Sequence, residues 1–444
     1  MIFSKDFIWG SGSSAFQVEG AADKDGKGRS IWDDACEEGH LTGTTDSSSC
    51  DCYNRIKQDV AIMKKIGLKA YRFSISWPRI MPDGIGKVNK AGIRYYNALI
   101  DELLANGIQP VITLYHWDLP SELHRRGGWL NPDISDWFYE YATVCAKEFG
   151  DRVKFFFTIN EFQSFLGLGY DYGAHAPFQR LSRTELLIAS HNALLAHGKA
   201  VMALRDNARG NVKISVAPCG VVKMPYSESD IEAARKATFG FMGKNVSNNT
   251  WFMDPIYFGS YPEDYLRAFS DTEFKYDKED MKVINQRLDY FSFNVYTGDY
   301  VRDDGSGGYE SVPHGINTVY NGMNWPTTPD CVYYGAKFFY ERYKTPIIVS
   351  ENGFCASDVK IKGETIDDGD RISYTKACLK GLERAAKEGA DVRGYFYWSL
   401  MDNLEWTEGY RKRFGLVYID YETKERELKR SALWYSDVIK NNGV

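Results

Sequence analysis

The chain has 444 residues, a formal net charge of −6, 43% hydrophobic residues and 26% charged residues. These values are ordinary for a globular protein and exclude the strongly basic surface that nucleic-acid binding needs. The sequence contains no apolar run of about 18 residues, the shortest that spans a bilayer, and its first residues lack the basic start and apolar core of a signal peptide. We therefore expect a cytoplasmic protein without nucleic-acid or membrane partners, and the sequence leaves its oligomeric state open.

The eight cysteines are scattered, with neither a CxxC pair nor the spacing of a zinc site. We expect free thiols in a reducing compartment. Cys50 and Cys52 fall in a segment rich in Ser and Thr, and a pair of surface thiols is the simplest interpretation. Aromatic residues make up 15% of the chain, with 11 Trp and 30 Tyr. This fits either a large aromatic core or a carbohydrate site, because sugar rings pack on aromatic faces.

Eight short runs of β-branched and aromatic residues recur along the chain. Most of them are almost continuously apolar, which is typical of strands buried on both faces of a parallel sheet. The runs cover residues 7–16, 69–76, 109–117, 154–160, 213–219, 290–296, 346–353 and 394–400.

Segments with helical periodicity separate most of these runs. Residues 89–107 begin at Asn89, which can cap a helix, and residues 371–389 end in glycine. The alternation predicts an α/β protein of one domain, residues 1–444, folded as a (β/α)8 TIM barrel whose long βα loops form the active-site face. An open doubly wound sheet is the alternative, but the candidate for its glycine-rich turn lies inside the first run. Residues 303–324, rich in Gly and Ser, are expected to form a long surface loop.

Polar or ionisable residues lie at the ends of seven of the eight runs, where a barrel has its active site. The fifth run is the exception, since it ends in Pro218 and Cys219. A single polar residue at a strand end could merely face solvent, but the whole set indicates a shared pocket. The set comprises Gln17, Glu19, Arg72, His116, Trp117, Asp118, Asn160, Glu161, Asn294, Tyr296, Glu351, Asn352, Trp398, Asp402, Asn403, Glu405 and Trp406.

The chemistry open to this set is limited. The sequence has seven histidines, no HExxH motif and no pair of His in one strand, so we expect no metal site. It has no GxSxG nucleophile motif, and no Lys is buried in an apolar run where it could form a Schiff base. No cofactor is expected. Glu161 and Glu351 remain, and two carboxylates among aromatic and amide side chains are the arrangement for glycoside hydrolysis.

Seven segments of the chain resemble, in order, the motifs of glycoside hydrolase family 1, the β-glucosidase family. They include an N-terminal signature, FIWGSGSSAFQVEGA (7–21), and a nucleophile signature, IIVSENGFC (347–355). The others are YHWDLP (115–120), TINE (158–161), HNALLAHGKAV (191–201), WFMDPIYFGSYPE (251–263) and SLMDNLEWTEGYRKRFGLVYID (399–420). The resemblance covers nearly the whole chain and implies a (β/α)8 barrel that hydrolyses β-glycosides with retention.

Two glutamates carry the chemistry that the resemblance implies. Glu351 is the expected nucleophile and must be ionised, so Arg72 and a hydrogen bond from Tyr296 are expected to lower its pKa. Glu161 is the expected acid/base, and burial and the charge of Glu351 are expected to raise its pKa. Once Glu351 is glycosylated that charge is gone, and Glu161 can act as a base. Retention requires about 5–5.5 Å between the carboxyl groups, against about 6.5–9.5 Å for inversion.

The other matched residues are expected to hold the substrate. Trp398 is the implied platform beneath the sugar ring, Phe414 closes the pocket beside it, and Trp325 lines the leaving-group side. The implied substrate-binding set is Gln17, His116, Trp117, Asn160, Asn294, Tyr296, Trp325, Trp398, Glu405, Trp406 and Phe414, with Arg72 and Tyr296 supporting the nucleophile.

Three positions bear on the choice of substrate. Phe162 follows Glu161 where the family usually has Pro, which leaves the leaving-group preference open. Glu405 stands where the 6-phospho-β-glycosidase branch tends to carry Ser, and a carboxylate there would repel a 6-phosphate. Residue 161 is Glu, unlike the Gln of plant thioglucosidases, so leaving groups that need a proton are expected.

We therefore predict an exo-acting, retaining β-glucosidase. Its expected substrates are terminal non-reducing β-D-glucosyl residues of cellobiose-type oligosaccharides and of aryl and alkyl β-glucosides. Because Gln17 and Glu405 could meet the C4 hydroxyl of either epimer, some β-galactosidase or β-fucosidase activity is expected. A 6-phospho-β-glucosidase is the alternative within the family, and a catalytically silent sugar-binding barrel is the alternative in another class. The ratio of hydrolysis to transglycosylation stays open.

Overall fold

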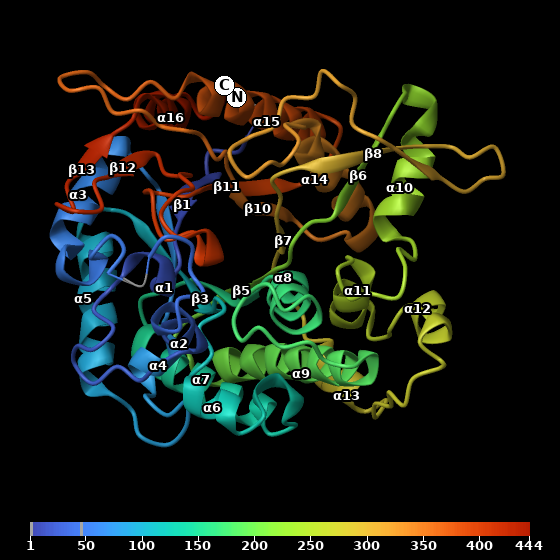
Figure 1. Ribbon diagram of the computed structural model, residues 1–444, viewed down its shortest axis with the longest axis horizontal. Helices are drawn as coiled ribbons and strands as arrows, with labels where there is room; N and C mark the ends of the chain where they lie inside the picture. Colours follow the sequence, from blue (N-terminus) through green and yellow to red (C-terminus); the bar gives the residue numbers. More distant parts are fainter. Residues whose placement is uncertain (1–2, 45–47) are drawn as a thin grey trace.

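Eight parallel strands form the centre of the computed structural model, which describes residues 3–44 and 48–444 (Figure 1). Each strand overlaps one of the eight predicted runs. The strands are β1 (Ile8–Gly12), β2 (Ala70–Ser74), β3 (Gln109–Tyr115), β4 (Phe155–Asn160), β5 (Lys213–Ala217), β7 (Phe291–Asn294), β10 (Ile347–Asn352) and β11 (Val392–Trp398).

The sheet closes on itself between β5 and β7. Its hydrogen-bonded order is β5-β4-β3-β2-β1-β11-β10-β7. The outer strands meet where the Asn294 N–H donates to the Pro218 carbonyl at 2.9 Å and where the Ser215 and Ser292 hydroxyls lie 2.8 Å apart. The predicted (β/α)8 barrel is therefore confirmed, and the carboxyl ends of all eight strands open on one face.

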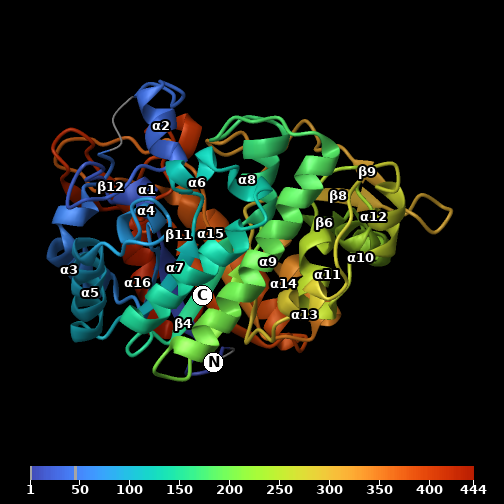
Figure 2. The same ribbon diagram turned by 90° about the horizontal axis from the view of Figure 1, so that it is seen from below.

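Helices surround the barrel, and Figures 1 and 2 show α7 and α9 side by side along one flank. The predicted helix at 89–107 is α5, and the Asn89 side chain caps it by accepting the Ala91 N–H at 3.1 Å. The predicted helix at 371–389 is α15. The helices are α1 (Ala15–Val18), α2 (Ile31–Glu37), α3 (Ile56–Ile66), α4 (Trp77–Ile80), α5 (Lys90–Ala105), α6 (Ser121–Arg125), α7 (Ile134–Phe149), α8 (Phe162–Leu166), α9 (Arg183–Asn207), α10 (Ile231–Phe239), α11 (Thr250–Phe258), α12 (Glu263–Ala268), α13 (Asp280–Ile284), α14 (Asp330–Tyr343), α15 (Gly369–Lys387) and α16 (Arg430–Asn441), with short turns η1 (Cys52–Asn54), η2 (Gly128–Leu130), η3 (Gly167–Asp171), η4 (Glu228–Asp230) and η5 (Trp406–Glu408).

Two small sheets extend the barrel on its active-site face. One has the order β6-β8-β9 and is built from β6 (Val222–Pro225), β8 (Gly298–Arg302) and β9 (Glu310–Val312). The other pairs β12 (Val417–Ile419) with β13 (Arg426–Leu428). Strand β9 lies within 303–324, so the segment expected to form a long surface loop contains a short strand. Its antiparallel pairing with β8 supplies hydrogen bonds that the Gly- and Ser-rich composition does not reveal.

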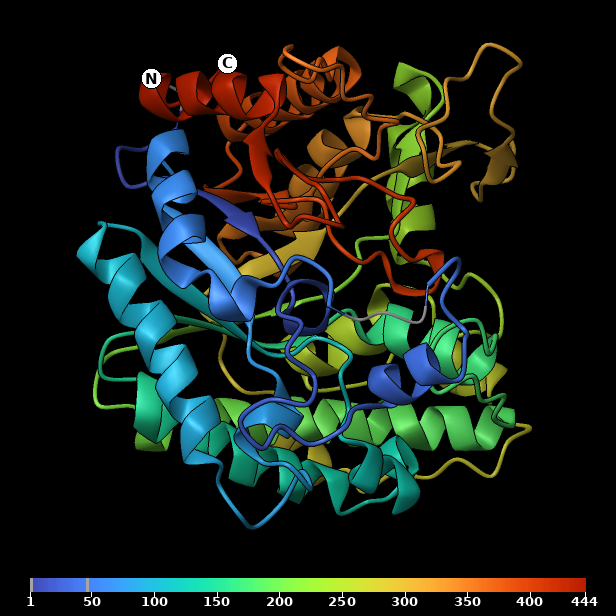
Figure 3. The ribbon, with the colours of Figure 1, turned by 60° about the vertical axis from the view of Figure 1, so that its left-hand side comes forward.

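The two ends of the chain lie side by side (Figure 3). Trp9 Nε1 donates to Asn442 Oδ1 at 2.8 Å. Just before α16, Lys429 is fully buried, and its ammonium lies 2.5 Å from Asp358 and 2.6 Å from Asp402. Asp402 belongs to the loop that follows β11, so the C-terminal segment is attached to that loop by a buried ion pair.

The eight cysteines, all of them among the described residues, form no disulfide bond, in line with the expected thiols. The expectation of surface thiols at Cys50 and Cys52 was wrong, because their exposed fractions are 0% and 9%. Their segment packs beneath the loop after β11, where the Cys50 thiol donates to the Asp402 carbonyl at 3.0 Å. Within the described ranges, no helix has the length and apolar character needed to cross a membrane.

Candidate active site

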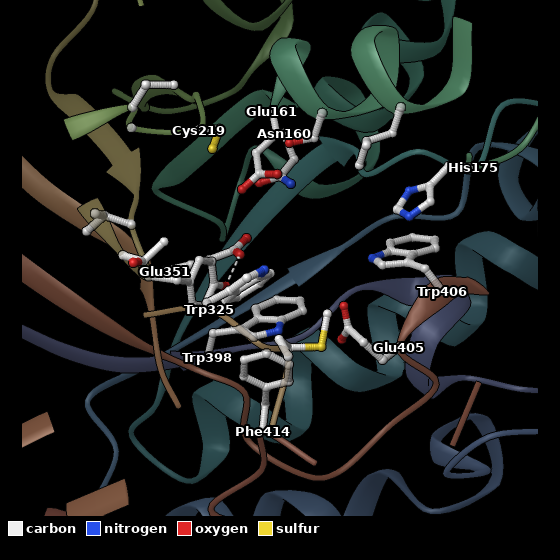
Figure 4. A pocket seen from close by; sticks show the side chains of 18 of the residues that line it. Asn160, Glu161, His175, Cys219, Trp325, Glu351, Trp398, Glu405, Trp406 and Phe414 are labelled. Atoms are coloured by element: carbon white, nitrogen blue, oxygen red, sulfur yellow. Dashed lines mark hydrogen bonds between the residues drawn. The ribbon is translucent and has the colours of Figure 1, made fainter. Parts of the chain in front are cut away.

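A cavity of about 410 Å³ opens at the carboxyl ends of the barrel strands (Figure 4). Most of the predicted site residues line it, although they come from strands far apart in the sequence. These are His116, Trp117, Asn160, Glu161, Tyr296, Trp325, Glu351, Trp398, Glu405, Trp406 and Phe414.

Three predicted residues lie directly behind the cavity wall. Arg72, Asn294 and Gln17 are at most 1% exposed and do not line the open space. The Gln17 amide already donates to the Leu404 carbonyl at 2.9 Å and lies 3.4 Å from Glu405 Oε2. Its position therefore fits support of Glu405, and its predicted contact with a sugar stays a prediction.

Glu351, near the end of β10, is held by a cation and a hydroxyl. Arg72 Nη1 lies 2.5 Å from its Oε1, and the Tyr296 hydroxyl donates to its Oε2 at 2.7 Å. Burial raises the pKa of Glu351, whereas Arg72 and Tyr296 act in the opposite direction. The expected lowering of this pKa was therefore wrong in its net sign, because only 4% of the residue is exposed and the loss of hydration outweighs both partners.

Glu161 follows β4 directly, and none of the ion pairs among the described residues involves it. Asn294 Nδ2 donates to its Oε1 at 2.8 Å. Burial, followed by the negative charge of Glu351, raises the pKa of Glu161 to about 7. The predicted direction is confirmed, and the residue is partly protonated at neutral pH.

Asn160 joins the groups around both glutamates. Its Oδ1 accepts from Arg72 Nη2 at 2.7 Å and from Asn294 Nδ2 at 3.0 Å. Its Nδ2 lies 3.2 Å from His116 Nε2. Burial lowers the pKa of His116 well below its usual value, so this ring is neutral at pH 7. Asn294 thus contacts Glu161 and, through Asn160 and Arg72, belongs to the same network as Glu351.

Aromatic rings form the side of the cavity that lies opposite Glu161 and Cys219 (Figure 4). This side is called the aromatic side below. The rings of Trp398 and His116 are stacked with centroids 5.6 Å apart, and those of Trp117 and Trp406 are 4.5 Å apart. Trp117, Glu161 and Trp406 all have left-handed backbone, with φ of 77°, 50° and 47°. Such conformations cost energy and cluster at functional sites.

Glu405 brings a third carboxyl group to the aromatic side. Burial, then the charges of Glu351 and Glu161, raises the pKa of Glu405 to about 8. The side chain is therefore largely neutral at pH 7 and can donate a hydrogen bond as well as accept one.

The sequence missed thirteen residues of the cavity lining, among them the mainly apolar segments after β5 and β7. The fifth run was judged to offer nothing polar, yet Cys219 and the residues after it line the cavity. Their position at a strand end was the one signal available. The missed residues are Ser164, Leu168, His175, Cys219, Gly220, Val221, Val222, Val295, Thr297, Gly298, Asp299, Met323 and Glu408.

The ionisable residues of the cavity are mainly acidic. No Lys or Arg is found among the described residues that line it. Nor do three His, Cys, Asp or Glu side chains come together as a metal site requires, within the part of the chain that the structure describes. Two supported carboxylates facing one apolar and aromatic cavity define the class of the protein, a (β/α)8-barrel glycoside hydrolase.

Comparison with known proteins places the chain within that class. The family model for glycosyl hydrolase family 1 matches residues 1–444. The chain is 42% identical to beta-glucosidase A of Acetivibrio thermocellus over 99% of both chains, and 41% identical to the 1,4-beta-D-glucan glucohydrolase of Thermotoga neapolitana over 100% of this chain and 99% of that one. The beta-glucosidase of Thermotoga maritima in complex with glucoimidazole superimposes with a TM-score of 0.91 at 40% identity, covering 100% of this chain and 99% of that one. The chain belongs to glycosyl hydrolase family 1, the β-glucosidase family.

Proposed function

We propose that the protein is an exo-acting β-glucosidase that releases terminal non-reducing β-D-glucosyl residues with retention, with Glu351 as the nucleophile and Glu161 as the acid/base. One observation carries the assignment of roles: the two carboxyl groups have opposite support. Glu351 is bound by the Arg72 guanidinium and the Tyr296 hydroxyl. Glu161 has an amide partner, Asn294, and a pKa of about 7.

The chemistry follows from this difference. In the first step a Glu351 oxygen bonds to the anomeric carbon, the bond to the leaving oxygen breaks, and Glu161 gives that oxygen its proton. The glycosyl ester has no charge, so the repulsion that raised the pKa of Glu161 disappears. In the second step Glu161 takes a proton from water, which attacks the same carbon and releases Glu351. The two inversions return the β-configuration.

The aromatic side of the cavity is the proposed sugar site. Trp398 is the platform under the ring, and Phe414 closes the pocket beside it. The hydroxyls are assigned to Gln17, His116, Trp117, Asn160, Glu405 and Trp406. The largely neutral Glu405 can donate a hydrogen bond to one sugar hydroxyl and accept one from another. If it binds the C4 hydroxyl of either epimer, some activity on β-galactosides or β-fucosides follows.

A 6-phospho-β-glucosidase is disfavoured by the charge of the cavity. The argument from Glu405 alone is weakened by its raised pKa, because a neutral carboxyl does not repel a phosphate. The lining offers no Lys or Arg among the described residues, however, and a buried phosphate needs such cations. A catalytically silent barrel is disfavoured by the presence of both supported glutamates.

The proposal extends to the organisation of the protein. We assign residues 1–444 to one catalytic domain, supported by the family match over that range. A cytoplasmic location is supported by eight cysteines that form no disulfide bond in the described chain. The proposed partner is the glycoside substrate alone, without nucleic acid or membrane.

Two measurements test the proposal. Proton NMR of p-nitrophenyl β-glucoside hydrolysis should show β-glucose as the first product, and α-glucose as first product would contradict retention. An inactivator that traps the glycosyl ester, 2-deoxy-2-fluoroglucosyl fluoride, should label the peptide that carries Glu351. The matched variant Glu351→Gln should stay unlabelled, and a label on any other residue would overturn the assignment.

A further inference from the structure

The cavity has an apolar wall beside Glu161, opposite the proposed sugar site. The Glu161 N–H donates to the Ala217 carbonyl at 2.7 Å, which fixes the end of β5 against the proposed acid. Residues 219–222, after β5, and residues 295–299, after β7, continue from there and line the cavity. Because the acid gives its proton to the leaving oxygen, this wall faces the leaving group.

Small apolar side chains make up most of this wall. Val221, Val222 and Val295 line it together with Gly220 and Gly298. Val221 is partly exposed to the cavity, and so is Cys219 beside it. Leu168 and Met323 add further partly exposed apolar surface to the cavity. Apolar surface left open in a concave site indicates an apolar occupant.

The backbone of the wall has no free hydrogen-bonding groups at its two central positions. The Val221 N–H and carbonyl are both bound to the Asn249 side chain, at 3.0 and 2.7 Å. The Gly298 N–H and carbonyl are both bound to the Thr328 hydroxyl, at 2.9 and 3.2 Å. A ligand hydroxyl placed here would meet backbone groups that already have hydrogen-bond partners.

The polar side chains near the wall are also engaged. The Gln163 amide accepts the Cys219 N–H and donates to the Asn248 carbonyl, both at 3.2 Å. The Thr297 hydroxyl donates to the Pro326 carbonyl at 2.7 Å. Asp299, at the rim, is paired with Lys223 at 2.5 Å.

We propose that this wall is a leaving-group site selective for apolar aglycones, alkyl or aryl, over a second sugar. The proposal rests on the proposed function, since it assigns the leaving group to the Glu161 side. A second glucose would place hydroxyls against backbone groups that already have hydrogen-bond partners, and hydroxyls left unpaired reduce binding strongly. An alkyl chain would instead cover the exposed apolar surface of Val221, Leu168 and Met323, and its transfer out of water would favour binding.

A series of alkyl β-D-glucosides tests the proposal. Ethyl, butyl, hexyl and octyl alcohols differ little in acidity, so kcat/KM reports contact with the wall and not the ease of bond cleavage. We expect kcat/KM to rise about 2- to 4-fold per methylene until the wall is covered, and to exceed that of cellobiose for the octyl compound. A flat series, or cellobiose as the better substrate, would overturn the proposal.

Cleavage of p-nitrophenyl β-glucoside separates this result from failure of the proposed function. If the pure protein does not cleave it, the proposed function itself fails. If it does and the alkyl series is flat, only the apolar leaving-group site fails.

Matched variants locate the effect on the wall. Val221→Thr keeps the shape and adds a hydroxyl, so the ratio of octyl glucoside to cellobiose kcat/KM should fall by about tenfold. Cys219→Ser is a second variant of the same kind and should lower the ratio in the same direction. Val359→Thr is the control, at a residue that is 70% exposed and does not line the cavity, and should leave the ratio unchanged. If neither wall variant lowers the ratio, the proposal is wrong.

Discussion

The two sides of the cavity are built from different parts of the barrel. The aromatic side is formed by residues at the ends of β3 and β11 and by the loop after β11, and it is dense in rings, amides and carboxyls. The side next to Glu161 is formed by the segments that lead into β6 and β8, and its backbone is already paired. The aromatic side therefore offers many hydrogen-bonding and stacking groups to a sugar, whereas the side next to Glu161 offers mainly apolar surface. The comparison leads to the hypothesis that separate segments of the chain recognise the glycosyl unit and the leaving group.

The largest expected effect follows from removal of the proposed nucleophile. Glu351→Ala should lower kcat by more than about 10⁴-fold, because no other group can form the glycosyl ester. Added azide should restore part of the activity and give the α-glycosyl azide, since it attacks from the vacated side. A β-azide product would mean that Glu351 does not lie on that side.

Removing the proton donor should discriminate between leaving groups. Glu161→Gln should cost about 10²–10⁴ in kcat/KM for octyl glucoside, which needs a proton on its leaving oxygen, and much less for 2,4-dinitrophenyl β-glucoside. Steady-state rates on the two substrates measure this directly. Equal losses would contradict the acid/base role of Glu161.

Filling the apolar side should leave the sugar side working. Cys219 is the one cysteine of the eight, all of them described, that is not buried. Methyl methanethiosulfonate should therefore add a single methylthio group and lower octyl glucoside kcat/KM by about tenfold, with a smaller loss for methyl glucoside. Burial and the charges of Glu161 and Glu351 raise the pKa of the Cys219 thiol, so labelling should speed up as the pH rises.

Two observations serve as controls for the labelling. Cys219→Ala should be insensitive to the reagent. Intact-mass measurement should show one added group, and several added groups would mean that buried thiols had become accessible.

The smallest effect concerns pH, and it tests how the two glutamates influence each other. Glu161 must be protonated and has a pKa of about 7, so kcat/KM for alkyl glucosides should fall about fivefold from pH 7 to pH 8. Glu351 must be ionised, and burial raises its pKa above its ordinary value, so activity should also fall on the acidic side at a higher pH than an ordinary glutamate would give. In Glu161→Gln the alkaline fall should disappear. If the alkaline fall in kcat/KM persisted in this variant, a group other than Glu161 would be its cause.

The sequence predicted the barrel and most residues on the aromatic side of the cavity for a physical reason. Buried parallel strands leave continuous apolar runs, and a sugar site needs polar residues at their ends, so both leave visible patterns. The wall after β5 left no such pattern, because valine and glycine at a strand end look like ordinary core. Its paired backbone depends on Asn249 and Thr328, which lie far from it along the chain.

The net direction of the pKa shift of a buried group could not be predicted from the sequence either. The partners of Glu351 were predicted correctly, but the net direction of its pKa depends on how completely water is excluded. The same holds for Cys50 and Cys52, whose polar neighbours in sequence suggested the surface. Cys50 contacts Asp402 and Cys52 contacts Met401, both more than 300 residues away in the chain, and both cysteines are buried. The left-handed backbone at Trp117, Glu161 and Trp406 was likewise not visible in the residue types.

The buried Lys429 also determines when the loop after β11 can reach its final contacts during synthesis on the ribosome. The last barrel strand pairs with the first, and the loop that presents Glu405 is attached through Asp402 to a lysine only 15 residues before Val444. A nascent polypeptide cannot form this ion pair until residue 429 has been synthesised. A polypeptide that stops before residue 429 therefore lacks the cation that holds the loop after β11 through Asp402.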